Sequence, residues 1–555
     1  MKVMHERKRL GDLLLEANLI TEAQLTEALS EKKEGQKLGD ALLERGYLTE
    51  QQLIQVLEFQ LGIPHVSLYG YPFDESLFSL ITHDFAKRNM VVPLRKEENR
   101  LLVAMADPMD FFAIDDLRLS TGFQIETAIV SKEEILRTIS KYYDLDDDVE
   151  EFALLQKNVQ GQEEETVTDG DSPVVRLVNQ LIANAVQQKA SDIHIDPHEK
   201  KLSIRYRVDG MLRVERVLPK NLQGMLTARI KIMANLDITE HRVPQDGRIK
   251  MNLDLKPIDL RVSTLPTVYG EKIVMRVLDL GSSLKSIHKL GFNSLNLKRF
   301  LKMIEQPNGI VLITGPTGSG KSSTLYAALN YLNKEETNII TVEDPVEYQL
   351  EGINQIQVNP AVGLTFSAGL RSILRQDPNI IMVGEVRDKE TADIAIRASL
   401  TGHLVFSTLH TNDALSTITR LMDMGVEPFL VATSLAGVVS QRLVRRICRD
   451  CQSVREPSAS ERDIFARRGI SIDRVTYGKG CGTCNMTGYK GRIAIHELMV
   501  MNEEIKQAIL NKEPFSQLRA LAVKNKMIFL MDDGLVKVKQ GLTTTEEVLR
   551  VSTLE

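Results

Sequence analysis

Apolar positions near the start of the chain recur in two similar stretches. Residues 8–32, KRLGDLLLEANLITEAQLTEALSEK, align with residues 36–60, QKLGDALLERGYLTEQQLIQVLEFQ, at an offset of 28 residues. Leucines at i and i+4 in each copy predict a short helix, a turn and a second amphipathic helix. Thr21 and Thr49 stand where the N-cap of that second helix is expected. The pattern therefore predicts a tandem helical repeat.

Strand-like and helix-like patterns then alternate through residues 66–143, with VVPL and LLVAMA as strands and KEEILRTISKYY as a helix. We place a first domain, helical and α+β, over residues 1–143. Residues 144–171 differ in character, because DLDDDVEE and GQEEETVTDGD are acidic, poor in aromatic residues and without a period. Such a composition is typical of a flexible linker.

Two further domains are predicted after this linker. Over residues 172–283, the helical pattern VVRLVNQLIANAVQQKA precedes the strand-like segments SDIHIDP, LSIRYRVDG and KIVMRVLDL, which indicates an α/β domain. Over residues 290–440, the apolar strands GIVLITG, NIITVED, NIIMVGE and HLVFSTL alternate with amphipathic helices. This alternation is typical of parallel strands joined by crossover helices. The last domain, 284–555, ends in a helical tail.

Composition narrows the classes of protein. The 555 residues are 43% hydrophobic and 26% charged, as in ordinary soluble proteins, and the formal net charge of −6 gives no global basic field for nucleic acid. The N-terminus lacks the apolar core of a signal peptide, and no apolar run approaches the roughly 18 residues that span a bilayer. We expect a cytoplasmic protein that meets a membrane only through partners.

The last domain contains a phosphate-binding loop. GPTGSGKS fits G-x-x-x-x-G-K-[ST], follows an apolar strand at 310–313 and precedes a helix predicted over 323–331. Its glycines let backbone N–H groups face phosphates, while Lys321 is expected to reach the β- and γ-phosphates and Ser322 to ligate Mg²⁺. This predicts a RecA-like P-loop ATPase. The expected nucleotide-binding residues are Gly315, Pro316, Thr317, Gly318, Ser319, Gly320, Lys321, Ser322 and Ser323.

Acidic residues follow two of the other apolar strands. One strand is followed by Glu343, Asp344 and Glu347, and another by Glu385 and Asp388. Ligands of open parallel sheets lie at the carboxyl ends of the strands, and hydrolysis needs carboxylates for Mg²⁺ and for the attacking water. Either Glu343 or Glu385 is a candidate for the water-orienting base. The alternative is that these acidic residues only cap the helices that follow the strands.

Two histidines flank the next strand in TGHLVFSTLHTND. The sequence predicts that His403 and His410 lie at the mouth of this strand, beside the nucleotide. A strand-end histidine is equally compatible with a hydrogen-bonded structural role. The choice between the two roles depends on what surrounds each ring.

All four cysteines fall into two C-x-x-C pairs, with 29 residues between the pairs. In a reducing compartment this spacing predicts metal ligands in preference to disulfides. Four thiolates form a closed tetrahedral zinc site, so the predicted role is structural. The ligands are Cys448, Cys451, Cys481 and Cys484.

Together these motifs resemble the type II secretion and type IV pilus assembly ATPases known as GspE, PulE or PilB. GPTGSGKS resembles the Walker A motif of that family, TVEDPVE its Asp box, VGEVRD its atypical Walker B motif and GHLVFSTLHTN its His box. ASDIHIDP, RVPQDGR, DLRVSTLPTVYGEKIVMR and QRLVRRICRDC extend the resemblance over residues 172–555. Retraction ATPases of the same superfamily lack the cysteine element and the long N-terminal region, so the resemblance favours assembly or secretion.

The resemblance implies further roles. Residues 172–283 would form a PAS-like second N-terminal domain, and the chain a homohexamer working on an inner-membrane platform protein of the PilC or GspF type, with a possible adaptor. Arg261 and Arg276, and less clearly Arg248, would reach the nucleotide, where guanidinium groups stabilise developing phosphoryl charge. Glu343, Glu385 and His410 would be catalytic residues.

The helical repeat resembles tandem motifs that bind cyclic di-GMP on such ATPases. It departs from them at Asn18, Lys32 and Lys37, and lysine does not reproduce the planar contacts of arginine with a guanine. A helical docking module for a membrane-bound partner is the alternative. The matching positions implied as ligand contacts are Arg9, Leu10, Gly11, Leu25, Leu29, Leu38, Gly39, Leu53, Leu57 and Gln60.

The expected function is therefore an ATPase that powers assembly of a type IV pilus or a type II secretion pseudopilus, with ATP, Mg²⁺ and Zn²⁺ as cofactors and cyclic di-GMP as a regulator. One rival is a nucleic-acid motor, which the acidic balance and the lack of a nucleic-acid-binding motif disfavour. Another is a DNA-uptake filament ATPase, which would share the same motor motifs.

Overall fold

The structure is a computed structural model, and it describes residues 10–17, 19–30, 32, 38–48, 50–68, 71, 73–143, 173–253, 256–279 and 286–552. The acidic stretch predicted as a linker, 144–171, lies outside these residues. The chain divides into two compact units: one holds the elements from α1 to α7 together with Gly480–Thr487, and the other holds the remaining elements from α9 to α21. Among the helices described, none combines the length and the apolar character that crossing a bilayer requires.

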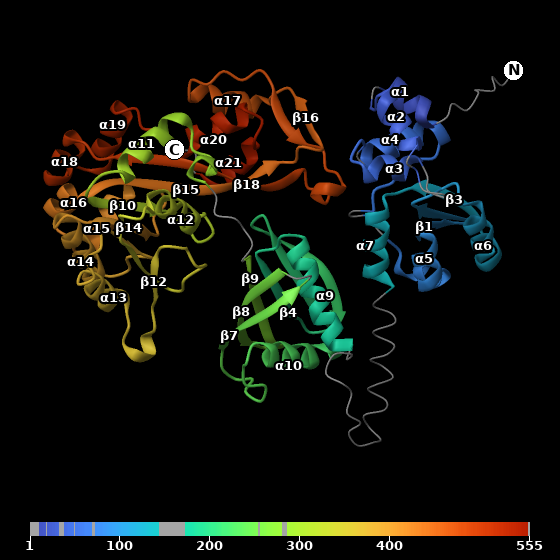
Figure 1. Cartoon of the computed structure of the whole chain (residues 1–555), viewed down its shortest axis with the longest axis horizontal. Helices are drawn as coiled ribbons and strands as arrows, with labels where there is room; N and C mark the ends of the chain where they lie inside the picture. The colour runs from blue at the N-terminus through green and yellow to red at the C-terminus, as the bar shows by residue number, and fades with distance from the viewer. Residues whose placement is uncertain are drawn as a thin grey trace. The chain divides into compact units, whose positions relative to one another are not determined.

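The first unit opens with the predicted tandem repeat, in which each copy is a pair of helices (Figure 1). Thr21 caps the second helix of the first copy, since its Oγ1 atom accepts from the Gln24 backbone N–H at 3.3 Å. Thr49, the predicted cap in the second copy, lies outside the described residues. The four helices are α1 (Leu10–Glu16), α2 (Glu22–Ser30), α3 (Leu38–Glu44) and α4 (Glu50–Leu61).

A three-stranded sheet with order β1-β2-β3 completes this unit, and β2 pairs with β1 antiparallel and with β3 parallel. The two predicted strands and the predicted helix are confirmed as β1, β2 and α7, whereas α6 and β3 went unpredicted. The elements are η1 (Glu75–Leu80), α5 (His83–Asn89), β1 (Val91–Glu97), β2 (Arg100–Met105), α6 (Phe111–Thr121), β3 (Gln124–Ile129) and α7 (Lys132–Tyr142).

The second unit begins with a six-stranded antiparallel sheet of order β6-β5-β4-β9-β8-β7. One face is apolar and buried, and the Tyr206 hydroxyl on that face donates to the main-chain oxygen of Leu181 in α9 at 2.6 Å. The elements are α9 (Pro173–Gln187), β4 (Asp192–Pro197), β5 (Lys201–Val208), β6 (Met211–Pro219), η2 (Lys220–Leu222), α10 (Gln223–Met233), β7 (Gln245–Leu253), β8 (Lys256–Thr267) and β9 (Gly270–Asp279).

A seven-stranded sheet follows, with order β12-β11-β13-β14-β10-β15-β18. The predicted parallel arrangement is confirmed for every pair except β15 and β18, which are antiparallel. The strands are β10 (Gly309–Thr314), β11 (Ile339–Glu343), β12 (Asn354–Gln357), β13 (Ile380–Val383), β14 (Leu404–Leu409), β15 (Leu435–Ile447) and β18 (Tyr489–Val500).

Helices cover both faces of this sheet because its central strands are apolar on both sides. Along β10, Ile310 and Leu312 belong to the core formed with α13 to α16, whereas Val311 and Ile313 belong to the core formed with α11 and α12. These helices are η3 (Ile287–Lys289), α11 (Ser294–Ile304), α12 (Lys321–Leu332), η4 (Pro360–Val362), α13 (Phe366–Ile373), α14 (Lys389–Leu400), α15 (Ser416–Asp423) and α16 (Pro428–Ser434).

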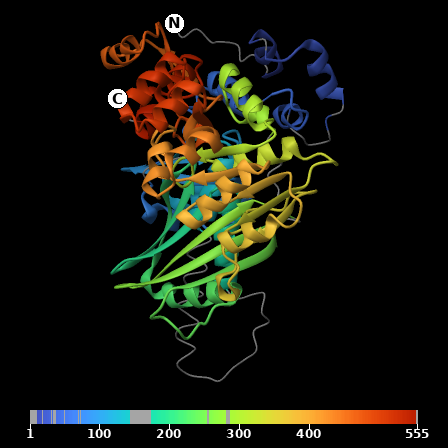
Figure 2. The same cartoon turned by 90° about the vertical axis from the view of Figure 1, so that its left-hand side faces the viewer.

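The predicted helical tail is present, and its helices are red in Figure 2. Two of its helices, α18 and α19, extend the core formed with α13 to α16, while α20 packs against β18. The remaining elements are β16 (Gln452–Arg455), α17 (Ala459–Arg467), β17 (Val475–Gly478), η5 (Gly482–Cys484), α18 (Glu503–Leu510), α19 (Phe515–Lys524), α20 (Leu530–Lys539) and α21 (Thr545–Val551).

Candidate functional site

The phosphate loop connects β10 to α12 as predicted, although α12 starts at Lys321, two residues before the expected first residue. Gly315, Gly318 and Gly320 have φ angles of 146°, 79° and 88°, a region that residues with a Cβ atom rarely adopt. The Nζ atom of Lys321 donates to the main-chain oxygens of Gly315 at 2.8 Å and Pro316 at 3.1 Å. The lysine therefore satisfies its charge on carbonyl groups of its own loop.

Glu385 and His410 lie beside this lysine. Glu385 follows β13, His410 follows β14, and a Glu385 carboxylate oxygen is 3.7 Å from the His410 Nε2 atom. Burial lowers the pKa of Lys321, and the Glu385 charge opposes that shift. Burial and the Lys321 charge lower the pKa of His410, which keeps its ring neutral near pH 7. A cation, a carboxylate and a neutral imidazole thus meet at the carboxyl ends of adjacent strands.

Arg387 is a second partner of Glu385, with its Nη2 atom 2.6 Å from the Oε1 atom of the carboxylate. The Glu385 side chain is 13% exposed, whereas that of Arg387 is 68% exposed. An ion pair with so exposed an arginine stabilises the protein little. Glu385 therefore keeps one oxygen toward His410 while an exchangeable partner holds the other.

Glu343, the other candidate base, is buried and fully hydrogen-bonded. Its Oε1 atom accepts from Thr341 Oγ1 at 2.6 Å and from Gln355 Nε2 at 3.0 Å. Its Oε2 atom accepts from the Tyr326 hydroxyl, whose pKa is raised by burial and by this carboxylate. With 4% of the residue exposed, Glu343 links β11, β12 and α12 inside the core.

The prediction that His403 lies at the mouth of β14 is wrong. His403 directly precedes β14 and is therefore at the amino end of the strand, opposite the end that carries His410. Its Nδ1 atom lies 2.9 Å from the main-chain oxygen of Ala398, which gives this histidine the structural role. Asp388 likewise has a structural role, because its carboxylate caps α14 by accepting from the Thr391 backbone N–H at 2.8 Å.

The predicted arginines form a transverse row on the polar face of the six-stranded sheet. Directly opposed residues on antiparallel strands lie on one face, close enough for like charges to repel. Asp192 offsets part of this repulsion, at 3.0 Å from Arg276 and 3.5 Å from Arg207. The row across β5, β4, β9, β8 and β7 is Arg207, Asp192, Arg276, Arg261 and Arg248.

Of these arginines, Arg261 contacts the segment that follows β11. Its Nη2 atom lies 3.3 Å from the Glu347 carboxylate and donates to the main-chain oxygen of Val346 at 3.2 Å. Arg276 pairs with Asp192, and Arg248 pairs with Asp259 on the neighbouring strand. The structure thus brings Arg261 against the predicted Asp box, and gives Arg276 and Arg248 carboxylate partners within their own sheet.

The four cysteines converge as the spacing predicted. Their Sγ atoms all lie within 4.8 Å of one another, and Cys448, Cys481 and Cys484 are buried. The Cys481 and Cys484 sulfurs are 3.7 Å apart, and the Cys481 backbone N–H donates to the Cys484 sulfur at 3.2 Å. Four sulfur ligands at this spacing fit a tetrahedral zinc ion, whose Zn–S bonds are about 2.3 Å.

In the helical repeat, the matched glycines have a packing role. A Cβ atom on Gly11 would lie 3.2 Å from the Leu25 methyl carbons, and one on Gly39 would lie 2.9 Å from a methyl carbon of Leu53. Leu10 and Leu38 are half-buried, as are Leu57 and Gln60, whereas Leu29 is 54% exposed. The predicted contact at Arg9 and the departures from the motif at Asn18 and Lys37 fall outside the described residues.

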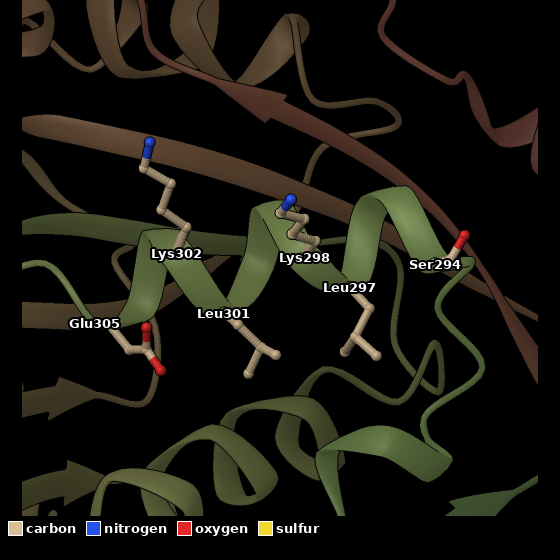
Figure 3. Close-up of a pocket in the computed structure, with 6 residues that line it drawn as sticks. All are labelled: Ser294, Leu297, Lys298, Leu301, Lys302 and Glu305. Carbon is tan, nitrogen blue, oxygen red and sulfur yellow. The ribbon is translucent and has the colours of Figure 1, made fainter.

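A hollow with a volume of about 430 Å³ lies along α11. Figure 3 shows Leu297 and Leu301 pointing to one side of this helix and Lys298 and Lys302 pointing to the other. The remaining lining residues are Ser294 and Glu305. No residue of the phosphate loop lines it, so this hollow is separate from the chemistry.

Two residues that the motifs did not single out reach the phosphate loop from β15. Gln441 is 2% exposed and hydrogen-bonds to Ser319 and Thr324, and Arg442 is 8% exposed and hydrogen-bonds to Asn412. The sequence feature that could have identified these two residues is their position as a polar pair inside the apolar run VVSQRLV. Such a pair is unfavourable in a buried strand unless both side chains are hydrogen-bonded.

Comparison with known proteins gives two family matches. The profile described as Type II/IV secretion system protein matches residues 167–550, and the profile described as MshEN domain matches residues 61–149. The first match covers most of the chain, including both sheets of the second unit.

Two curated relatives and a solved structure agree with these matches. The type IV pilus assembly ATPase PilB of Myxococcus xanthus is 43% identical over 560 residues, 98% of each chain. The type II secretion system ATPase E of Vibrio cholerae is 47% identical over 412 residues, 74% of this chain and 81% of its own. The ATPase DotB of Yersinia pseudotuberculosis is 20% identical with a TM-score of 0.53, covers 71% of this chain and 97% of its own, and shows a likeness of fold.

Proposed function

The chain belongs to the type II/IV secretion system protein family, and from this membership we propose that it is an ATPase that powers assembly of a type IV pilus or a type II secretion pseudopilus. The observation that carries the proposal is the meeting of Lys321, Glu385 and His410 at the phosphate loop. Each comes from a different connection at the carboxyl ends of β10, β13 and β14, where open parallel sheets hold their ligands.

The nucleotide is proposed to displace the contacts that Lys321 makes with its own loop. The ammonium group would exchange the oxygens of Gly315 and Pro316 for those of the β- and γ-phosphates, while backbone N–H groups at the start of α12 face the anion. Ser322, exposed at the start of this helix, is the proposed Mg²⁺ ligand, and the ion would neutralise charge that develops on the phosphates.

Of the two candidate carboxylates, we assign Glu385 the orientation of the attacking water. Its carboxylate lies beside Lys321 and His410, whereas all the bonds of Glu343 lie inside the core. A neutral His410 has one ring N–H that donates and one ring nitrogen that accepts, which suits a residue that senses the water or the γ-phosphate. Glu343 is then a positioning residue that holds β11 to α12 through Tyr326.

Arg261 and Arg276 are the arginines proposed to reach the nucleotide from the PAS-like domain, 172–283. The contact of Arg261 with Glu347 and Val346 supports this for Arg261, because it already joins the two sheets of the unit next to the Asp box. Arg276 would have to leave Asp192, an exchange that a stronger anion favours. Closure of the PAS-like domain on the ATPase domain, 284–555, would couple hydrolysis to motion.

We assign the cysteine cluster a structural zinc ion. All four ligands are sulfur atoms, which leaves no open coordination position for chemistry. The ion would fix the hairpin of β16 and β17 to the segment before β18, since the Lys479 backbone N–H donates to Cys451 O at 3.0 Å and the Cys448 N–H to Gly488 O at 2.9 Å.

Cyclic di-GMP is proposed as a regulator that binds the helical repeat of residues 1–143. The repeat contains two helix pairs built on one motif, which would suit a ligand with two guanine bases. Because Gly11 and Gly39 pack against leucines, the repeat motif is accounted for in part by folding alone. Calorimetric titration of the full chain with cyclic di-GMP, with GMP as the control, tests this binding. If neither nucleotide produces heat, the helical docking role is the one that remains.

We propose a homohexamer that works in the cytoplasm against an inner-membrane platform protein of the PilC or GspF type. The relatives named above are pilus assembly and secretion ATPases, which supports a filament-building role. The direct test compares ATP turnover with detergent-solubilised platform protein and with duplex DNA. Stimulation by the platform protein supports the proposal, whereas stimulation by DNA alone supports the nucleic-acid motor.

A further inference from the structure

Gln441, in β15, lies directly behind the phosphate loop. Its Nε2 atom donates to the main-chain oxygen of Ser319 at 2.9 Å, and its Oε1 atom accepts from the Thr324 hydroxyl at 2.7 Å. Because the residue is 2% exposed, losing either bond would leave a buried polar group unpaired, which costs free energy. One side chain therefore ties the loop to the first turn of α12.

The glycines at both ends of the loop make room for Gln441. A Cβ atom on Gly315 would lie 2.5 Å from the main-chain oxygen of Gln441, and one on Gly320 would lie 2.8 Å from its Nε2 atom. Both distances are far below a normal contact. One side of the loop therefore packs closely against Gln441, and the other side is the one that phosphates are proposed to occupy.

Arg442, the next residue, holds the loop that carries His410. Its Nη2 atom donates to the main-chain oxygen of Asn412 at 2.7 Å, and its Nη1 atom donates to that of Gln441 at 3.1 Å. Burial lowers the pKa of Arg442, and the charges of Glu497 and Asp413 oppose that shift. The guanidinium thus bridges two backbone segments that both border the nucleotide site.

We propose that Gln441 and Arg442 are positioning residues of the nucleotide site. Gln441 keeps the phosphate loop in the shape that receives phosphates, and Arg442 keeps the His410 loop in register with it. The inference rests on the proposed ATP site and deepens it, since neither residue belongs to the expected catalytic set. Because the two residues are consecutive on β15, one strand joins both loops, and a shift of either loop is transmitted to the other.

The test for Gln441 measures nucleotide affinity separately from turnover. Gln441→Glu keeps the size of the side chain and an acceptor for Thr324, but it places a carboxylate oxygen against the Ser319 oxygen. We expect the Kd for MgADP and the KM for ATP to rise about tenfold, with kcat little changed. Gln441→Asn, which withdraws the amide without adding charge, gives the same readout if the first variant folds poorly.

The test for Arg442 uses a matched pair on the same strand. Arg442→Lys keeps the charge but loses the planar guanidinium group, whose two Nη atoms donate to two different carbonyl groups. We expect kcat to fall about tenfold while the Kd for MgADP is unchanged. Arg445→Lys makes the same exchange at an arginine that pairs with Glu547 at 2.8 Å, away from both loops. This control should leave kcat and the Kd unaltered.

Three results would overturn the inference or separate it from the proposed function. A folded Gln441→Glu with the wild-type Kd for MgADP overturns the role of Gln441. Equal losses of kcat in Arg442→Lys and Arg445→Lys overturn the role of Arg442. A wild-type chain that binds MgADP without hydrolysing ATP contradicts the proposed function, and the MgADP comparison still decides the case for Gln441.

Discussion

A carboxylate oxygen of Glu385 lies 3.7 Å from the Nε2 atom of His410, and both side chains border the phosphate-loop lysine. The two residues follow neighbouring strands, β13 and β14, which pair in parallel from Ile380 to Val383. This register pairs Val383 with Ser407, and Glu385 and His410 follow these two residues closely, so the sheet sets the distance between their side chains. Under the proposed function, this pair would hold the attacking water molecule beside the γ-phosphate.

The first prediction concerns this carboxylate. Glu385→Gln should lower kcat about 10²- to 10⁴-fold, the range for loss of a general base, and should leave ATP binding intact. Single-turnover hydrolysis and nucleotide titration measure the two quantities. Glu504→Gln, a like exchange at an exposed carboxylate of α18, is the control and should behave as wild type. Wild-type kcat in Glu385→Gln would refute the assignment.

A second prediction distinguishes the role of Glu343 from that of Glu385. Both carboxylate oxygens of Glu343 accept hydrogen bonds, and in Glu343→Gln an NH₂ group that cannot accept replaces one of them. The variant should therefore have a free energy of unfolding lower by about 1–3 kcal/mol. Its kcat should fall less than that of Glu385→Gln. Thermal unfolding and steady-state kinetics measure both effects. An unchanged melting temperature with a larger loss of kcat would reverse the roles of the two carboxylates.

Metal content provides a third prediction. Elemental analysis should find about one zinc ion per chain, and Cys484→Ser should lose it because a structural site needs all four sulfur ligands. The affinity for MgADP should stay unchanged. Met486→Leu, at an exposed residue next to the cluster, should retain the metal. Full zinc occupancy in Cys484→Ser would exclude the cluster as the binding site.

The fourth prediction follows from a buried histidine in β18. His496 is 0% exposed, its ring stacks on Phe292 with centroids 3.8 Å apart, and neither ring nitrogen has a hydrogen-bond partner in the described part of the chain. Burial, helped by the Lys537 charge, lowers its pKa well below 6.5. Below pH 6.5 the unfolded chain binds a proton there that the folded chain excludes, so stability falls as the pH falls.

His496→Phe should remove this dependence, because phenylalanine fills the same stacked position without titrating. Between pH 7 and pH 5 the wild type should lose about 2 kcal/mol more unfolding free energy than the variant. Denaturant unfolding at both pH values gives the difference. Parallel losses in the two proteins would show that His496 does not contribute.

The sequence predicted features that depend on local pattern. The phosphate loop could be located because an apolar strand, a motif with four defined positions and a helix stand in order. The cysteine cluster could be located because its spacing suits one metal. The helical repeat was visible as an offset between two copies, and the structure shows the reason for its glycines in the approach of Leu25 and Leu53.

Features that depend on long-range packing could not be predicted. Glu343 ends one apolar strand and Glu385 follows another, so their sequence contexts are similar. Only Glu343 is held in the core, where it accepts a hydrogen bond from Tyr326 on a helix earlier in the chain. Gln441 is distant in sequence from the phosphate loop and becomes its neighbour only because β15 pairs with β10.

Phosphate release from the purified full-length protein is the direct test of whether the phosphate loop of this chain hydrolyses ATP. We expect Mg²⁺-dependent turnover in the wild type and none above background in Lys321→Ala, with both proteins melting at the same temperature. Turnover that persists in Lys321→Ala, or a folded wild type that binds MgATP and releases no phosphate in the presence of its platform partner, would contradict it.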